Sequence, residues 1–395
     1  MKKISAYFLI LLLFTGGNMN YEFTPVVEKV ASTFTYTTDS NQISFNMPMN
    51  VFSGGDGTLY VLDTFNNMIH KIDSYGNTTL FTGNIVMLDE YTPLLDSFQF
   101  PMGFHRDGSL ENALFNRPVD GVKDAYGRIF IVDHSNHAIR VIDTSVLYNN
   151  DLEENRYITS VFTLAGGNGA GYSNGFGLEA TFYYPSAIAI DSDGNLYIAD
   201  AGNNVIRRID TNGYVTTVAG LGGVFGYRNG NANESLFRHP MGIAVNETGT
   251  IFVADTGNHL IRIIEGNAVR TLAGTYTLPF QGLGVGRRIH AIPNYPQGGF
   301  GDTGYYNGAT FNAPKGLTLW GDVLIVADSL NHAIRAVLPT GEVSTIISAR
   351  GDVNETLHEP IISVPQGVYV LDNKLLIVNM GNNSILRITW RDTYA

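Results

Sequence analysis

Apolar residues fall into short runs along the chain, separated by clusters of glycine, asparagine and aspartate. The pattern is clearest between Pro185 and Gly220, where four runs rich in β-branched residues occupy positions 187–190, 196–199, 205–209 and 215–219. Runs of this length, bounded by turn-forming residues, are typical of short antiparallel strands. This stretch therefore predicts a four-stranded unit.

The same motif of turn-forming residues occurs six times along the chain. An acidic or amide residue, two variable residues, Asn, then Asn or His, one variable residue and Ile begin at Asp63, Asp133, Asp200, Asp255, Asp328 and Asn379. A proline opens the first run of each copy, at Pro48, Pro118, Pro185, Pro240, Pro314 and Pro365. Because one such unit cannot bury both of its faces, six copies predict a radial array in which neighbouring sheets cover one another. The expected fold class is all-β, a six-bladed β-propeller of four-stranded antiparallel blades.

Two of the copies, PSAIAIDSDGNLYIADAGNNVIRRI and PMGIAVNETGTIFVADTGNHLIRII, resemble NHL repeats, and the resemblance extends from Met47 to Ile388. It implies the propeller fold. It does not select a function, because NHL propellers include protein-binding, RNA-binding and lyase members.

The last copy contains only three strand-like runs, at 367–371, 375–378 and 385–389. The segment VASTFTY, at residues 30–36, resembles an outer strand but precedes the first copy. We expect this N-terminal strand to complete the sixth blade, because closure removes the open sheet edge that an incomplete ring would expose.

Residues 1–18 have the layout of a secretory signal, with Lys2 and Lys3 before an apolar run at 4–14. Residues 19–395 would then form a single propeller domain, secreted or displayed on a cell surface, with no stable membrane insertion. An uncleaved anchor and a buried N-terminal strand remain alternatives. A virion component, or a cytoplasmic protein that starts at Met19, is the alternative localisation.

The net charge limits the classes of partner that the chain can bind, and the cysteine content limits its chemistry. The chain has 24 basic and 36 acidic side chains, for a formal net charge of −12, whereas binding to a phosphate backbone requires clustered Lys and Arg. Nucleic acid is therefore an unfavoured partner. The absence of cysteine excludes disulfides and thiolate chemistry but leaves the redox compartment open.

The segments that join the blades are longer than tight turns require, and they lie at the same end of the strands as the Asp-x-x-Asn turns. We interpret this as the functional face. Three junctions contain related fragments, GYSNGFGLEATF at 171–182, GYRNGNANESLF at 226–237 and GYYNGATF at 304–311. These are interpreted as structural loops that dock their Tyr and Phe between blades.

Polar residues that repeat in register are predicted to be structural. They include the six residues that begin the motif, the arginines seven positions later (Arg140, Arg207, Arg262 and Arg335) and the turn histidines His137, His259 and His332. Packed sheets are about 10 Å apart and metal bonds are near 2 Å, so histidines on different blades cannot share one zinc ion. No cofactor is expected, although a calcium ion on an Asp-rich loop or in the channel stays open.

The copies disagree at the axis. The position two after each proline is Ala or Gly in blades three to six, but Asn50 and Asp120 in blades one and two. Together with residues that flank the prolines, these predict a polar cup at the channel mouth, formed by Asn50, Arg117, Asp120, Tyr184, His239 and Lys315. The alternative is a water-filled mouth with satisfied polar groups. On this interpretation an Asp120→Ala variant should fold almost normally, because Ala187 fills the equivalent position.

The predicted function is a non-enzymatic binding or scaffold propeller that recognises a protein, peptide or glycan. A lyase-type NHL enzyme with its active site at the channel mouth is the alternative. No HExxH motif is present to favour the enzyme.

Overall fold

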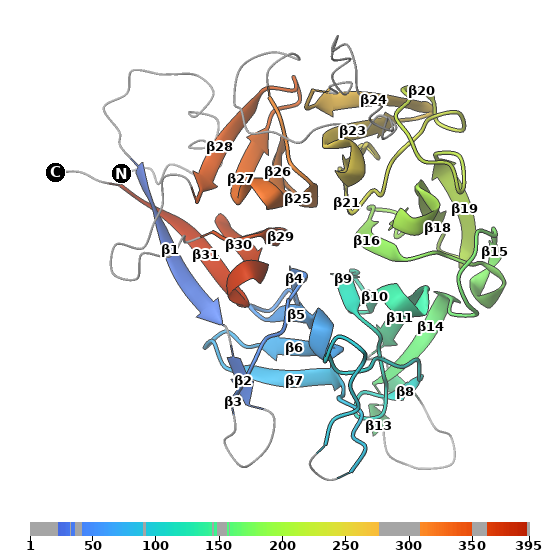
Figure 1. Cartoon of the computed structure of the whole chain (residues 1–395), viewed down its shortest axis with the longest axis vertical. Helices are drawn as coiled ribbons and strands as arrows, with labels where there is room; N and C mark the ends of the chain where they lie inside the picture. Colours follow the sequence, from blue (N-terminus) through green and yellow to red (C-terminus); the bar gives the residue numbers. More distant parts are fainter. Residues whose placement is uncertain are drawn as a thin grey trace, which may run out of the picture.

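Six antiparallel sheets surround one axis, and the first strand of each lies innermost (Figure 1). The structure is a computed structural model that describes residues 23–31, 33–35, 42–89, 92–143, 146–147, 156–157, 159–275, 309–349 and 362–392. The predicted all-β, six-bladed propeller is confirmed. The predicted signal at residues 1–18 lies outside the described residues. Within the described ranges, no helix is long and apolar enough to cross a membrane.

In blades one to five, the four main strands follow one another in chain order from the axis outward. Blade one contains β4 (Asn50–Ser53), β5 (Leu59–Asp63), β6 (Met68–Ile72) and β7 (Thr78–Gly83). Blade two contains β9 (Pro118–Lys123), β10 (Ile129–Asp133), β11 (Ala138–Asp143) and β14 (Ser160–Gly166). Blade three contains β16 (Pro185–Ile190), β17 (Leu196–Asp200), β18 (Val205–Ile209) and β19 (Tyr214–Ala219). The four runs of the clearest repeat therefore form the strands predicted for them.

The second half of the ring follows the same plan. Blade four contains β21 (Gly242–Val245), β22 (Ile251–Asp255), β23 (Leu260–Glu265) and β24 (Ala268–Ala273). Blade five contains β25 (Pro314–Trp320), β26 (Val323–Asp328), β27 (Ala333–Val337) and β28 (Val343–Ser348). Blade six contains β29 (Pro365–Leu371), β30 (Lys374–Asn379), β31 (Ser384–Asp392) and, outermost, β1 (Phe23–Ala31). Two short hairpins, β2 (Thr33–Thr35) with β3 (Gln42–Ser44) and β12 (Val146–Leu147) with β13 (Arg156–Tyr157), lie outside the blades.

The N-terminal strand closes the ring, as predicted, but it is not the segment at residues 30–36. Strand β1 pairs antiparallel with β31, from Phe23 opposite Asp392 to Ala31 opposite Ile385. Because β31 spans nine residues rather than the predicted five, its partner extends back to Phe23. Thr33–Thr35 pairs with β3 instead of continuing along β31. The salt bridge between Glu28 and Arg387, 2.7 Å long, joins the two strands.

Blades two, three and four carry a fifth strand that the sequence did not predict. The short strands β8 (Gly108–Ser109), β15 (Gly175–Phe176) and β20 (Gly230–Asn231) come from the junction before each blade. They pair with the outer strands β14, β19 and β24. The junctions therefore run along the outside of the blade that follows them.

The hydrophobic core is divided among the blade interfaces. The buried apolar residues of the described chain form six clusters, and each cluster combines side chains of two neighbouring blades. The residue three before each opening proline is fully buried in every copy, as Phe45, Phe115, Phe182, Phe237, Phe311 and Ile362. Since each sheet buries both faces against its neighbours, the ring is stabilised as a whole.

Candidate functional site

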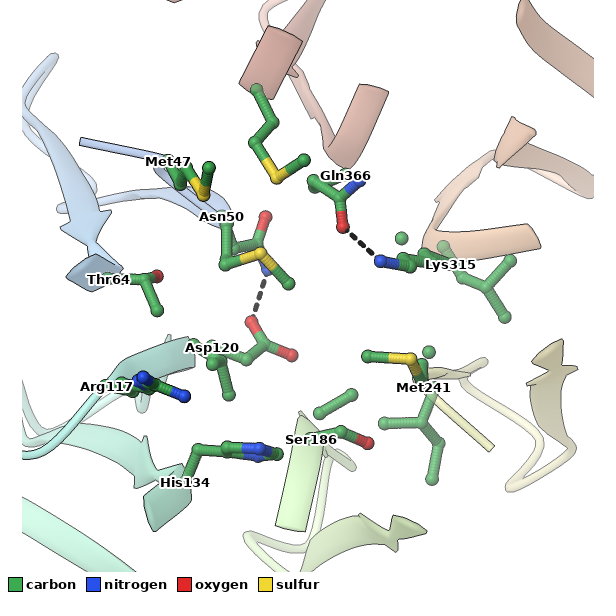
Figure 2. A pocket seen from close by; sticks show the side chains of 18 of the residues that line it. Met47, Asn50, Thr64, Arg117, Asp120, His134, Ser186, Met241, Lys315 and Gln366 are labelled. Carbon is green, nitrogen blue, oxygen red and sulfur yellow. Dashed lines mark hydrogen bonds between the residues drawn. The ribbon is translucent and has the colours of Figure 1, made fainter. Parts of the chain in front are cut away.

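A cavity of about 310 Å³ lies on the axis at the face formed by the turns between second and third strands (Figure 2). Its wall comes from the first residues of the innermost strands and from three short 3-10 turns, η1 (Thr64–Asn66), η2 (His134–Asn136) and η7 (Met380–Asn382). Asn50, Arg117, Asp120 and Lys315 line it, as the broken symmetry of the repeats predicts. Tyr184 and His239 are not among the residues that line the cavity.

The residue directly after each opening proline lines the cavity in all six blades. The set is Met49, Val119, Ser186, Met241, Lys315 and Gln366. In four of these blades the pairing of the first strand is irregular just after the proline, so this residue lies within a β-bulge. A bulge interrupts the alternation of side chains and can redirect one of them. Of this set the sequence analysis identified only Lys315, although the set varies from copy to copy as Asn50 and Asp120 do.

Glycine at the position two after proline allows the innermost strands to approach one another. A Cβ atom on Gly242 would collide with the carbonyl oxygen of Lys315, and one on Gly316 would lie 2.5 Å from the carbonyl oxygen of Gln366. A side chain larger than hydrogen therefore cannot be placed there without moving the adjacent blade. The close approach brings Lys315 and Gln366 side by side at the cavity.

Asp120 connects three blades. Its Oδ1 accepts hydrogen bonds from the Gly121 N–H, at 2.7 Å, and from Nδ2 of Asn50, while its Oδ2 accepts one from the Ile188 N–H at 2.9 Å. Burial raises the pKa of the Asp120 carboxyl to about 7, against the opposing effect of these donors. The expectation that Asp120→Ala would fold almost normally overlooked these contacts, which Ala187 does not make. Asp120 therefore braces the cavity floor, whether or not it also touches a ligand.

The residues before the prolines have different environments in different blades. The guanidinium of Arg117 lies 4.8 Å from the centre of the Phe65 ring, and its Nη2 is 3.4 Å from Oδ2 of Asp96. Tyr184 packs its ring against His137, with centroids 4.6 Å apart. Nδ1 of His239 is 3.3 Å from the carbonyl oxygen of Ala201. Tyr184 and His239 therefore pack on the turns of the preceding blades rather than facing the cavity.

The turn position occupied by Asn or His joins each blade to the next. Its side chain accepts a hydrogen bond from the backbone N–H of the residue before the following proline. The acceptor-to-donor pairs are His137 with Tyr184 (3.1 Å), His259 with Ala313 (2.9 Å), His332 with Val364 (3.1 Å), Asn67 with Arg117 (2.8 Å), Asn204 with His239 (2.9 Å) and Asn383 with Met47 (2.8 Å). All six turn residues have a left-handed backbone. Among the described residues, no three His, Asp or Glu side chains are grouped so as to hold a metal ion.

The first residue of the 3-10 turn makes a second contact between blades. Thr64, Thr256 and Ser329 donate their hydroxyls to the carbonyl oxygens of Pro118, Pro314 and Pro365 at 2.7, 2.6 and 2.5 Å. In blade three this position is Ala201, and Ser186 donates to Pro240 instead, at 2.9 Å.

In blade two, His134 makes the same contact between blades through one ring nitrogen. Its second ring nitrogen is a further polar group. Its Nδ1 is 2.8 Å from the carbonyl oxygen of Pro185 and must carry the proton, because a carbonyl only accepts. Nε2 is then an acceptor on a ring that reaches toward the cavity (Figure 2). Burial lowers the pKa of His134 to about 4, so the ring is neutral at pH 7. The sequence analysis missed His134, although the equivalent positions hold Thr, Ala, Ser or Met.

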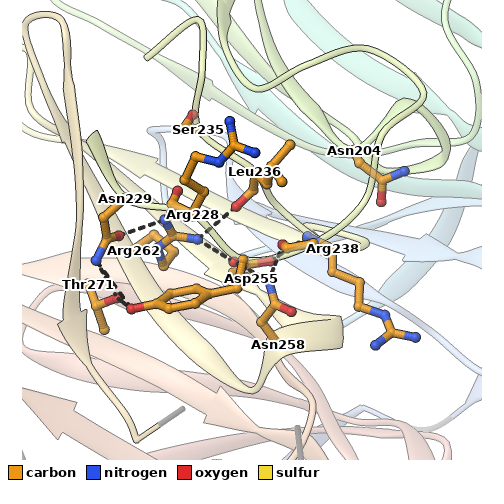
Figure 3. A network of polar contacts seen from close by, with 12 residues as sticks. Asn204, Arg228, Asn229, Ser235, Leu236, Arg238, Asp255, Asn258, Arg262 and Thr271 are labelled. Carbon is orange, nitrogen blue, oxygen red and sulfur yellow. Dashed lines mark hydrogen bonds and ion pairs between the residues drawn. The ribbon is translucent and has the colours of Figure 1, made fainter. Parts of the chain in front are cut away.

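A repeated polar cluster lies between the blades, away from the axis (Figure 3). In blade four, Oδ2 of Asp255 is 2.7 Å from Nη1 of Arg262, and both side chains are fully buried. Oδ1 of Asp255 accepts the N–H of Arg238 at 2.7 Å. Arg262 also donates to Oδ1 of Asn229, at 2.7 Å, and its guanidinium lies 4.9 Å from the centre of the Tyr227 ring. The junction fragment at 226–237 is thus fastened to its blade by Arg262.

The same aspartate–arginine pair occurs in three further blades, as Asp133 with Arg140, Asp200 with Arg207 and Asp328 with Arg335. Burial raises the pKa of Asp200 and of Asp328 to about 6, despite the neighbouring guanidinium. Arg140 binds Asp107 at 2.6 Å, which reveals a related fragment at 104–115 that the sequence analysis did not identify. Blade one replaces the arginine with His70, 3.0 Å from Asp63.

Comparison with known proteins identifies the repeats. A family model described as NHL repeat matches residues 182–209 and 237–264, which belong to blades three and four. The chloroplast protein SUPPRESSOR OF QUENCHING 1 of Arabidopsis thaliana is 29% identical over 207 residues, half of this chain and 17% of that protein. NHL repeat-containing protein 2 of Homo sapiens is 34% identical over 95 residues, 23% of this chain and 13% of that protein. The chain thus spans less than a fifth of the length of these curated relatives.

Among solved structures, an auxiliary nutrient binding protein from Bacteroides ovatus is similar over 94% of this chain and 78% of its own, with a TM-score of 0.56 and 12% identity. At this identity the similarity supports the fold alone.

Proposed function

Because the chain is an NHL-repeat β-propeller, we propose that it is a non-enzymatic binding protein that holds a small amphipathic ligand, free or at the end of a peptide, in its axial cavity. The cavity volume of about 310 Å³ is at the lower end of the range of small-molecule sites. The site lies on the face of the blade junctions, where a larger partner that carries such a group would also meet the loops.

The observation that supports this proposal is the combination of adaptable apolar walls with a few fixed polar groups. Met47, Met49, Met241 and Met380 line the cavity together with Phe65, Val119, Ile243 and Leu317. Methionine is flexible and polarisable, so it packs well against ligands of irregular shape. Lys315, Gln366, Asn50 and Asp120 supply the polar groups that would orient a ligand.

The methionines also provide the test. With ¹³C-labelled methionine ε-methyl groups, a set of small amphipathic compounds is added while methyl spectra are recorded. We expect the Met49 and Met241 signals to shift, with Met49→Leu and Met241→Leu used for assignment. Met68, which is buried in blade one, and Met87, which is exposed on a junction, are internal controls and should stay unchanged. Shifts confined to Met87, or none at all, would contradict the proposal.

The same samples address the lyase alternative. Each bound compound is recovered and its mass is measured after prolonged incubation. A binding protein returns the compound intact, whereas conversion to a product would favour the enzyme.

A further inference from the structure

Lys315 is a partly buried cation with an incomplete set of partners. Its Nζ donates to Oε1 of Gln366 at 2.6 Å. Within the described part of the chain this is the one hydrogen bond that its ammonium group makes, and no carboxylate pairs with it. An ammonium carries three donors, so two of them remain for another acceptor.

Gln366 is oriented toward this lysine. Its Nε2 donates to the carbonyl oxygen of Val364 at 3.3 Å, which directs Oε1 at Nζ of Lys315 (Figure 2). A neutral amide oxygen does not balance a positive charge. Removing a charge from water costs free energy when no counterion lies beside it. Lys315 therefore lowers the stability of the folded protein at this position. Burial accordingly lowers the pKa of Lys315.

The other charged groups of the cavity are already engaged. Arg117 is paired with Asp96 at the rim. Asp120 accepts hydrogen bonds from Asn50, Gly121 and Ile188. Lys315 is therefore the cation in the described lining that no carboxylate pairs with.

Resting on the proposed function, we propose that the ligand is an amphipathic carboxylate whose anionic group binds Nζ of Lys315, and whose apolar part packs against Met49, Met241 and Leu317. A carboxylate offers two oxygens to the two remaining donors of Nζ. The cavity has the volume of roughly ten water molecules, so it holds an acid of about ten non-hydrogen atoms. A free aliphatic acid and the C-terminal residue of a peptide share this chemistry.

The experiment compares charged and neutral probes of equal shape by calorimetry. Octanoate and octanamide represent a free acid, while N-acetyl-leucine and its amide represent a peptide end. We expect at least one carboxylate to bind the wild-type protein at least about tenfold more tightly than its amide. The tighter of the two carboxylates identifies the source of the ligand.

Two lysine variants supply the control. Lys315→Met keeps the length of the side chain but removes its charge, and it should abolish the preference for carboxylates. Lys123→Met alters a lysine that lines the chamber on the other side of Asn50 and Asp120, and donates to the carbonyl oxygen of Gly54. This variant should bind all four probes as the wild type does. Melting curves of both variants verify that they are folded.

Failure of this inference differs from failure of the proposed function. Equal binding of carboxylates and amides, or carboxylate binding that persists in Lys315→Met, overturns the charge assignment and leaves a cavity that binds neutral amphipathic ligands. If none of the probes binds wild-type protein or shifts the cavity methionines, both proposals are overturned.

Discussion

The polar groups between the blades and those at the axis follow opposite rules. Between the blades, an aspartate, an arginine seven residues later and an asparagine three residues later recur with nearly the same distances in blades two to five. At the axis, the residue after the opening proline is Met, Val, Ser, Met, Lys and Gln in successive blades. A polar group that recurs from blade to blade is one that the blade structure requires. A position whose residue varies from blade to blade is not constrained by that structure. This contrast is why the axial cavity, rather than the conspicuous charged clusters, is the candidate site.

Blade six shows that the repeated pair is replaced as a unit. Its motif begins with Asn379, and the position of the arginine holds the buried Leu386. Asn379 still accepts the N–H of Ser363 at 2.6 Å, as the aspartates do in their blades. The negative and the positive charge have both been lost, so neither is left buried alone. The following predictions test how far the blades and the axis differ.

The largest effect is expected from opening the ring. Deletion of residues 1–31 removes β1 and its pairing with β31. It also removes the apolar side chains that β1 contributes to the interface between blades six and one. An unpaired edge and an uncovered apolar face should then cause loss of cooperative folding or aggregation. Circular dichroism and size-exclusion chromatography measure the outcome. Deletion of residues 1–18 is the control, and a monomer that melts like the full chain after the longer deletion would contradict the assignment of β1.

Breaking one repeated pair should be costly. Arg262→Leu leaves the Asp255 carboxylate buried without its cation and should lower the free energy of unfolding by about 3–5 kcal/mol. The double variant Asp255→Asn with Arg262→Leu reproduces the arrangement of blade six. It should be more stable than the single variant by at least about 1 kcal/mol, as measured by urea denaturation. A double variant that loses the sum of both single effects would show that the two residues act independently.

Asp120 lies where the two regions meet, and its replacement should have an intermediate effect. Asp120→Ala leaves the Gly121 and Ile188 N–H groups without their acceptor and should lower stability by about 2–4 kcal/mol. An aspartate titrates near 3.8 in the unfolded chain but near 7 here, so the folded protein binds more protons between these values. The stability that Asp120 contributes is therefore present at low pH and declines as pH rises through 7.

Denaturation at pH 5 and pH 8 checks both parts of the Asp120 prediction. The difference in stability between the wild type and Asp120→Ala should be larger at pH 5. A variant with wild-type stability at both pH values would instead support the prediction from the sequence that Asp120→Ala folds almost normally.

The sequence predicted the ring well because its signals are local. Turn residues, β-branched runs and the opening prolines define each blade within one repeat, and six copies determine the architecture. The position of β1, by contrast, depends on the length of β31. That length is decided only by the pairing between the two ends of the chain. The lining of the axial cavity was predicted in part: Asn50 and Asp120 by their departure from the repeat, and Arg117 and Lys315 as neighbours of the opening prolines. Ser186 and Gln366 were missed because the copies were compared at the position two after proline rather than at the position directly after it. Tyr184 and His239 were expected to line the cavity, but they pack on the turns of the preceding blades.

The smallest effect is expected where the repeats offer two solutions to one problem. His137 accepts the Tyr184 N–H through Nδ1, and Asn204 accepts the equivalent His239 N–H through Oδ1. Both have a left-handed backbone, which asparagine adopts readily. His137→Asn should therefore change the free energy of unfolding by less than about 0.5 kcal/mol. His137→Ala should cost about 1–2 kcal/mol, because it removes the acceptor and strains the turn. Thermal melts of the two variants distinguish these cases. A large loss in His137→Asn would mean that the imidazole has a role beyond accepting this bond, and would move the turn histidines from the repeated scaffold to the functional residues.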